Sequence, residues 1–325
     1  MKKKLWLKLL LALLVIAAAV LVFAGNYLVD FAIVREENTE KNVAPPSEVS
    51  DEARSVIDAN LAAINAQKET WLAGTAVEEV SITSEDGLTL KGDLFAGDED
   101  SHRWLLGIHG YTGQRSDTQN VASFYGERGY HVLTPDMRAH GESEGKYIGM
   151  GWLDRKDVLQ WIDFIIARDP QAEIILHGVS MGGATVMMVS GEELPENVKG
   201  IVEDCGYTSV WDIFADELAY LFGLPTFPVL DAANLAANIR AGYDFKEASA
   251  VKQVAKSTVP MVFIHGSEDN FVHTDMVYEV YEACQTPKEL LVVEGAGHGQ
   301  AYQMDPELYF STIFDFLDKE CFVTG

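Results

Sequence analysis

Ser180 lies in the pentapeptide Gly178-Val179-Ser180-Met181-Gly182, which has the G-x-S-x-G spacing of a nucleophilic serine. A short apolar run, 174–177, precedes this pentapeptide, and a run with helical character, 184–189, follows it. A bare G-x-S-x-G is a weak signal, but between a strand and a helix it is the pattern of a nucleophile elbow, where glycines permit a tight turn. We therefore predict that Ser180 is a nucleophile rather than only a helix N-cap.

A serine hydroxyl needs a neighbouring base, normally a histidine that a carboxylate orients. His298 lies in the glycine-rich segment 294–299, directly after the apolar run 290–293. Asp269 follows another apolar run, 261–264. We predict the triad Ser180, Asp269 and His298, with Asp204 and Glu268 as the alternative carboxylates.

The elements that would position these residues alternate along the chain. Two alternating runs, 80–83 and 88–95, flank Asp86-Gly87 and predict a hairpin. Short apolar runs at 104–108, 131–134, 174–177, 201–202, 261–264 and 290–293 are separated mostly by helical segments. This predicts an α/β fold with a mostly parallel sheet covered by helices on both faces and with its site at the carboxyl ends of the strands.

Three further motifs resemble those of the α/β-hydrolase superfamily, in particular its single-domain bacterial serine esterases and peptidase-like hydrolases. They are His109-Gly110-Tyr111-Thr112-Gly113, the segment Pro135-Asp136-Met137-Arg138-Ala139-His140-Gly141-Glu142-Ser143, and the segment 265–272 that contains Asp269. The resemblance covers about residues 77–319, and Ala139 departs from the glycine that is commoner at its position. The chain order serine, aspartate, histidine is also the order of that fold.

The resemblance implies an oxyanion hole made of two backbone N–H groups, those of Tyr111 and Met181. Fixed amides suit this task because a tetrahedral intermediate concentrates negative charge on one oxygen. Four polar residues beside these motifs are predicted to orient loops rather than to transfer protons: His109, Asp136, Arg138 and His140.

Residues 206–257 form a longer connection than two neighbouring strands require. We predict a small helical cap here, inserted after strand six, that supplies an apolar pocket over the site. Core packing alone is the alternative explanation for its large side chains, which are Tyr207, Trp211, Phe214, Tyr220, Leu221, Phe222, Leu224, Phe227, Leu230 and Tyr243.

The N-terminus carries an apolar run, 5–23, beside Lys2, Lys3, Lys4 and Lys8. About 20 apolar residues suffice to cross a bilayer as a helix, and the lysines favour a cytoplasmic N-terminus. We predict a signal-anchor at 1–34, a linker with an accessory helix at 35–76, and a hydrolase domain at 77–325 on the outer face of the cell membrane. The alternative is a signal peptide cleaved before Gly25, which would release a secreted protein.

The composition limits the partners. A formal net charge of −26 excludes a nucleic-acid partner, which would need clustered Lys and Arg. Three scattered cysteines fit neither a disulfide framework nor a zinc site, and the histidines have no companions at metal-ligand spacing. We predict no metal and no cofactor.

Together these features predict a membrane-anchored serine hydrolase, a carboxylesterase that acts on a neutral, fairly apolar ester through an acyl-enzyme on Ser180. An amide or peptide hydrolase, or an acyltransferase, would share the same machinery and differ only in the pocket. A non-catalytic binding protein that kept the fold is the alternative from another class.

Overall fold

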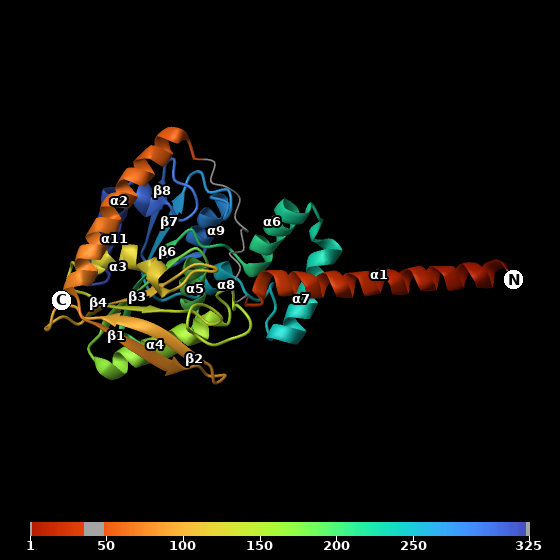
Figure 1. The fold of residues 1–325 in the computed structure, drawn as a ribbon, viewed down its shortest axis with the longest axis horizontal. Coiled ribbons are helices and arrows are strands. Elements are labelled where there is room, and N and C mark those ends of the chain that lie inside the picture. The colour runs from red at the N-terminus through yellow and green to blue at the C-terminus, as the bar shows by residue number, and fades with distance from the viewer. Residues whose placement is uncertain (1, 36–48, 323–325) are drawn as a thin grey trace.

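The computed structural model describes residues 2–35 and 49–322 and is built around one eight-stranded sheet (Figure 1). The strands lie in the order β1-β2-β4-β3-β5-β6-β7-β8. β1 and β2 form the predicted antiparallel hairpin, β2 pairs antiparallel with β4, and all other pairs are parallel. The strands span Val77–Thr83, Thr89–Phe95, Arg103–Ile108, His131–Pro135, Glu173–Val179, Val198–Asp204, Met261–Gly266 and Lys288–Val293, for β1 to β8 respectively.

Helices cover both faces of this sheet because side chains alternate along each strand and both faces are apolar. Leu106 packs into one core, with α4 (Asp154–Arg168), α5 (Met181–Val189), α8 (Ala250–Val254) and α9 (Asp275–Ala283). Its neighbour Leu105 packs into the other, with α2 (Asp51–Gly74), α3 (Gln119–Gly126), α10 (Ala301–Met304) and α11 (Pro306–Glu320). A short 3-10 helix, Arg115–Thr118, precedes α3. The predicted doubly covered, mostly parallel sheet is confirmed.

Two helices between β6 and β7 form the predicted cap after strand six: α6 (Val210–Phe222) and α7 (Thr226–Ala241). Their axes differ by 119° across the short break between them. Hydrogen bonds from Asn234 to Asp244 and from the Phe245 N–H to Asn234 close the cap back onto the domain. α8 also lies within the 206–257 segment, but it packs against α5 and α9 and therefore covers the sheet.

The N-terminal helix α1 (Lys2–Ile33) is one continuous helix that extends far from the sheet (Figure 1). Among the described helices it is the only single one that is both long and apolar enough to cross a membrane, and a signal sequence would have the same properties. Most of the predicted spacer after it, residues 36–48, lies outside the described residues. The accessory helix is α2, whose N-cap Ser50 accepts a hydrogen bond from the Ala53 N–H at 3.1 Å.

The last turns of α1 are fixed to the rest of the molecule. The Ile148 N–H donates to the carbonyl of Ile33 at 2.7 Å, and the Arg35 N–H donates to Lys146 at 2.9 Å. The guanidinium of Arg35 donates to the carbonyls of Gly141 and Ser143, both at 2.6 Å. These bonds hold the end of α1 beside the loop that precedes α4.

Candidate active site

The chain turns sharply at Ser180, between β5 and α5. Ser180 has φ 59° and ψ −119°, a backbone conformation that a residue with a side chain seldom adopts and that marks a strained turn. Its flanking glycines permit the turn, because a Cβ at Gly178 would overlap the backbone of Gly182, and a Cβ at Gly182 would overlap the carbonyl of Ile108. The turn places the Ser180 hydroxyl at the carboxyl end of β5, in front of the N-terminus of α5.

The structure brings Ser180, His298 and Asp269 together in one chain of hydrogen bonds. His298 Nδ1 lies 2.7 Å from Asp269 Oδ2, and His298 Nε2 lies 2.8 Å from Ser180 Oγ. An ionised carboxylate only accepts, so Nδ1 carries the proton and the unprotonated Nε2 accepts from the serine hydroxyl. This is the tautomer in which an imidazole can remove the serine proton.

Asp269 is held as an anion in a buried position. Its Oδ1 accepts the N–H groups of Phe271 and Val272, both at 3.0 Å. His265 Nε2 lies 3.2 Å from Asp269 Oδ2, so a second histidine contacts the oxygen that His298 uses. Burial pushes the pKa of Asp269 upward, but the hydrogen bonds from His265 and His298 outweigh it and hold that pKa well below its usual range. The carboxylate therefore stays charged at neutral pH.

The two alternative carboxylates lie elsewhere. Asp204, after β6, accepts the hydroxyl of Tyr309 at 2.9 Å, and burial raises the pKa of Asp204 to about 6. Glu268 is exposed and contacts the hydroxyl of Ser267 at 3.3 Å. Of the three candidates, Asp269 is therefore the one hydrogen-bonded to His298.

The two backbone amides expected to bind an oxyanion flank Ser180. Met181 is the first residue of α5, where N–H groups precede the intrahelical bonding pattern. Tyr111 follows β3, and the preceding Gly110 approaches Ser180 so closely that a Cβ there would lie 3.3 Å from the serine Cβ. Tyr111, Ser180 and Met181 all line the same cavity. The two turns that would supply the amides are thus adjacent to the nucleophile.

Buried polar side chains stabilise the loops behind these turns. His109 Nε2 accepts the Met137 N–H at 3.0 Å, and His140 Nε2 accepts the Thr112 N–H at 3.2 Å. Burial lowers the pKa of His109 to about 4 and that of His140 to about 3, so both rings are neutral. Arg138 donates two hydrogen bonds, at 2.6 and 2.7 Å, to the buried carboxylate of Asp157. These groups orient loops and do not contact Ser180.

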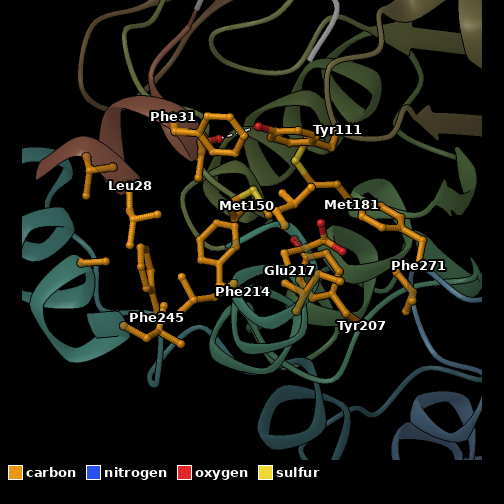
Figure 2. Close-up of a pocket in the computed structure, with 18 of the residues that line it drawn as sticks. Leu28, Phe31, Tyr111, Met150, Met181, Tyr207, Phe214, Glu217, Phe245 and Phe271 are labelled. Atoms are coloured by element: carbon orange, nitrogen blue, oxygen red, sulfur yellow. Dashed lines mark hydrogen bonds between the residues drawn. The ribbon is translucent and has the colours of Figure 1, made fainter. Parts of the chain in front are cut away.

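A cavity lined almost entirely by apolar side chains begins at Ser180 and Met181 and extends beneath the cap (Figure 2). Of the cap side chains predicted to form a pocket, five line it: Tyr207, Phe214, Leu221, Phe222 and Leu230. Trp211, Tyr220, Leu224, Phe227 and Tyr243 do not line it, and Tyr220, Leu224 and Phe227 are exposed to solvent instead. The apolar lining of the cavity suits an apolar ligand.

One wall of the cavity comes from a place that sequence reasoning missed. Leu28, Val29, Phe31 and Ala32 of α1 line it, and the hydroxyl of Tyr111 donates to the carbonyl of Ala32 at 2.6 Å (Figure 2). The one local signal is Gly25, where a side chain would overlap the backbone of Ala232 in α7. A glycine at a helix crossing permits such close packing.

Glu217 of α6 is the second residue that the sequence did not reveal. Among the described residues that line the cavity it alone carries a carboxyl group, and its Oε2 is buried without a hydrogen-bond partner (Figure 2). Burial, reinforced by the neighbouring charge of Asp216, raises the pKa of Glu217 to about 7. Its charge therefore changes near neutral pH, inside an otherwise apolar space.

This position predicts a pH dependence of substrate binding. Because the pKa is raised, Glu217 is neutral below about pH 7 and becomes charged above it. For an apolar ester such as p-nitrophenyl octanoate we expect KM to rise severalfold between about pH 6 and about pH 8, since a buried charge opposes apolar binding. Glu217→Gln should remove this rise while Glu279→Gln, on the exposed side of α9, should keep it. A KM profile for Glu217→Gln that matches the wild type would contradict the assignment.

Cys205 contributes to a cluster of potential metal ligands. Its sulfur, one Asp269 oxygen and one His298 nitrogen lie within 4.8 Å of one another. Burial raises the pKa of the Cys205 thiol well above its usual value, and a protonated thiol is a poor ligand. Asp269 and His298 are already hydrogen-bonded to each other. These residues therefore do not fit a metal site.

The amino-acid sequence is similar to those of known hydrolases and of one uncharacterized protein. Residues 99–218 match the model of a family described as serine aminopeptidase, S33. An uncharacterized protein of Bacillus subtilis, YqkD, is 26% identical over 239 residues, which cover 73% of this chain and 78% of that protein. A carboxylesterase of the same bacterium is 21% identical over 231 residues, which cover 66% of this chain and 92% of the carboxylesterase.

Solved structures with a similar fold include an esterase and a peptidase. The esterase Pf2001 of Pyrococcus furiosus superimposes with a TM-score of 0.62 at 25% identity, over 76% of this chain and 94% of the esterase. The acylaminoacyl peptidase of Pyrococcus horikoshii superimposes with a TM-score of 0.58 at 16% identity, over 76% of this chain and 42% of the peptidase. Esterases and peptidases are therefore both among the similar structures.

Proposed function

We propose that this chain, a serine hydrolase of the α/β-hydrolase superfamily, is a carboxylesterase in which Ser180, His298 and Asp269 form the catalytic triad. The observation that carries the proposal is the hydrogen-bond chain from Asp269 through His298 to Ser180, which ends at the apolar cavity. A hydroxyl aimed at such a cavity, beside a correctly oriented base, is suited to attack the carbonyl carbon of an apolar ester.

Acylation begins when His298 Nε2 takes the Ser180 proton as Oγ forms a bond to the carbonyl carbon. The amides of Tyr111 and Met181 donate to the resulting oxyanion. The intermediate collapses as the ester C–O bond breaks, and His298 passes its proton to the leaving alcohol. Water then attacks the acyl-enzyme with His298 as base again, and releases the acid and the free Ser180 hydroxyl.

Amide or peptide hydrolysis is the second candidate. It is favoured by the match to a serine aminopeptidase family and by the similarity to an acylaminoacyl peptidase. The same triad would act, with protonation of an amine leaving group as the harder step. The apolar lining of the cavity favours the ester, because peptide groups buried in it would lack hydrogen-bond partners.

We also propose that α1 is retained as a membrane anchor with the catalytic domain outside the cell. The four N-terminal lysines support this orientation. The predicted cleavage point, before Gly25, lies inside a continuous helix and at its close crossing with α7. Cleavage before Gly25 would therefore cut the helix at its crossing with α7 and remove most of α1 from the protein.

One experiment tests these assignments together. The membrane-extracted protein is treated with a fluorophosphonate, and its intact mass and the labelled peptide are determined. We expect one adduct, on Ser180, and a chain that retains residues 1–24. Rates on p-nitrophenyl esters should rise with acyl-chain length, while matched p-nitroanilides should not be cleaved measurably. An unlabelled wild-type protein contradicts the catalytic proposal, measurable anilide cleavage favours the peptidase, and a chain that begins at Gly25 contradicts the anchor.

A further inference from the structure

The cavity that begins at Ser180 ends against the helix that would cross the membrane. Leu28, Phe31 and Ala32 of α1 line it, and Phe31 packs edge-to-face on Phe222 of α6 with ring centroids 5.5 Å apart. α1 therefore does more than attach the domain to a bilayer. It forms a wall of the space in which a substrate would lie.

The apolar run in α1 indicates where the surface of a bilayer would lie. The apolar run 5–23 spans about 28 Å as a helix, close to the roughly 30 Å of a hydrocarbon core. With this run in the membrane, the surface lies near Gly25, where α7 crosses α1. Leu28 is then only about 8 Å beyond the hydrocarbon boundary. The cavity wall thus lies at the level of the lipid headgroups.

The cap exposes large apolar side chains beside this level. Phe227, Leu235 and Ile239 of α7 are 77%, 63% and 76% exposed. Leu235 and Ile239 are one turn apart and lie opposite the buried Ala233 and Ala237. Figure 1 shows α6 and α7 gathered around the end of α1 nearest the sheet, while the rest of α1 extends away from them. An exposed apolar face of this kind indicates a binding surface.

Polar and aromatic side chains at the same level suit an interface with lipid headgroups. Tyr27 of α1 and Tyr220 of α6 are half exposed, and tyrosines are enriched at this depth. Arg240 pairs with Asp30 and donates to Asn26 at 3.1 Å, so the charges at the α1 and α7 crossing are neutralised in place. These side chains therefore suit contact with lipid headgroups better than contact with bulk water.

We propose that the cap rests in the outer membrane leaflet and that the enzyme draws from it a neutral lipid ester, whose acyl chain lies in the cavity walled by α1 and α6 and so reaches Ser180. The inference rests on the proposed esterase function and on the proposed retention of α1 as an anchor with the domain outside the cell. Neutral lipids are favoured because the chain has a net charge of −26 and the cavity holds Glu217. An anionic lipid would be repelled by the net charge of the chain and, above about pH 7, by Glu217.

The test uses the full chain in phosphatidylcholine vesicles that contain dioleoylglycerol. The variant carries Leu235→Glu and Ile239→Glu, and the matched control carries Tyr278→Glu and Leu308→Glu, two similarly apolar exposed residues outside the cap. We expect the cap variant to cleave dioleoylglycerol at least tenfold more slowly than the wild type, yet to cleave soluble p-nitrophenyl butyrate within twofold of it. The control variant should match the wild type on both substrates.

The outcomes separate the two proposals. A wild type that cleaves neither substrate contradicts the esterase function and the inference with it. A wild type that cleaves only the soluble ester, or a cap variant that cleaves dioleoylglycerol normally, overturns the inference alone. Replacing dioleoylglycerol by phosphatidylglycerol should lower the rate at least tenfold, and an equal or higher rate would overturn the preference for neutral lipids.

A second measurement reports insertion without catalysis. In a Cys321→Ser background, an environment-sensitive fluorophore on Ile239→Cys should shift to the blue in vesicles and be quenched by spin-labelled lipid. The same label on Leu308→Cys should not respond. If the Ile239 label instead shifts at high protein concentration in detergent and is indifferent to the lipid quencher, the surface binds a second copy of the chain and the inference is wrong.

Discussion

Ser180→Ala is expected to lower kcat/KM for p-nitrophenyl butyrate by roughly 10⁴ to 10⁶-fold, the loss seen when a triad member is removed from a serine hydrolase. The reason is that alanine leaves His298 without a nucleophile to activate, while the cavity and the oxyanion amides stay in place. The residual rate would come from binding and from those amides alone. Steady-state kinetics with purified protein measure the effect.

Ser190→Ala is the matched control for this variant. Ser190 caps the other end of α5, is buried, and donates to the carbonyl of Met187 at 2.7 Å. Its loss should reduce stability by about 1 kcal/mol and leave kcat/KM nearly unchanged. A Ser180→Ala protein that keeps more than a hundredth of the wild-type rate would show that another group is the nucleophile.

Asp269→Asn is expected to lower kcat by roughly 10⁴-fold. The amide that replaces the carboxylate can turn its NH₂ group toward His298, which favours the tautomer with the proton on Nε2 and leaves nothing to accept the Ser180 proton. The negative charge that stabilises a protonated His298 is lost as well. KM should change little, because Asp269 lies outside the cavity lining.

Asp204→Asn provides the comparison, since Asp204 is a buried aspartate at the end of the neighbouring strand. Its oxygen accepts from Tyr309, and an asparagine oxygen can accept the same bond. We expect a decrease of less than tenfold. A large loss in Asp204→Asn together with a small one in Asp269→Asn would move the orienting carboxylate to β6.

The strands and the turn at Ser180 could be predicted because their signals are local. The run 174–177 is apolar, the glycines at 178 and 182 leave room for the backbone, and an apolar helix follows, so all levels of the pattern agree. The sequence was less informative about which carboxylate, Asp269, Asp204 or Glu268, orients His298. All three lie at or after strand ends, and only the loop geometry that points Asp269 at His298 distinguishes them.

No comparable local pattern in the sequence indicates that α1 lines the cavity. Between Leu9 and Gly25 its residues are apolar on every side, and only Asn26 and Asp30 interrupt the apolar character beyond. Some residues of α1 face the cap and others would face lipid, and both surroundings favour the same residue types. The periodicity of apolar residues in α1 therefore does not indicate which of them pack against the rest of the protein. The placement of Glu217 in the cavity was equally hidden, since an acidic residue on an amphipathic helix ordinarily faces water.

The hydrogen bonds of Arg35 and Ile33 hold the end of α1 against the loop before α4. If α1 anchors the chain and the cap takes its ester from the bilayer, as we propose, the enzyme meets its substrate by lateral diffusion in two dimensions. The quantity that saturates it is then the mole fraction of the ester among the lipids, not its concentration in the surrounding volume. Diluting the ester with inert phospholipid should slow the reaction, whereas adding buffer should not.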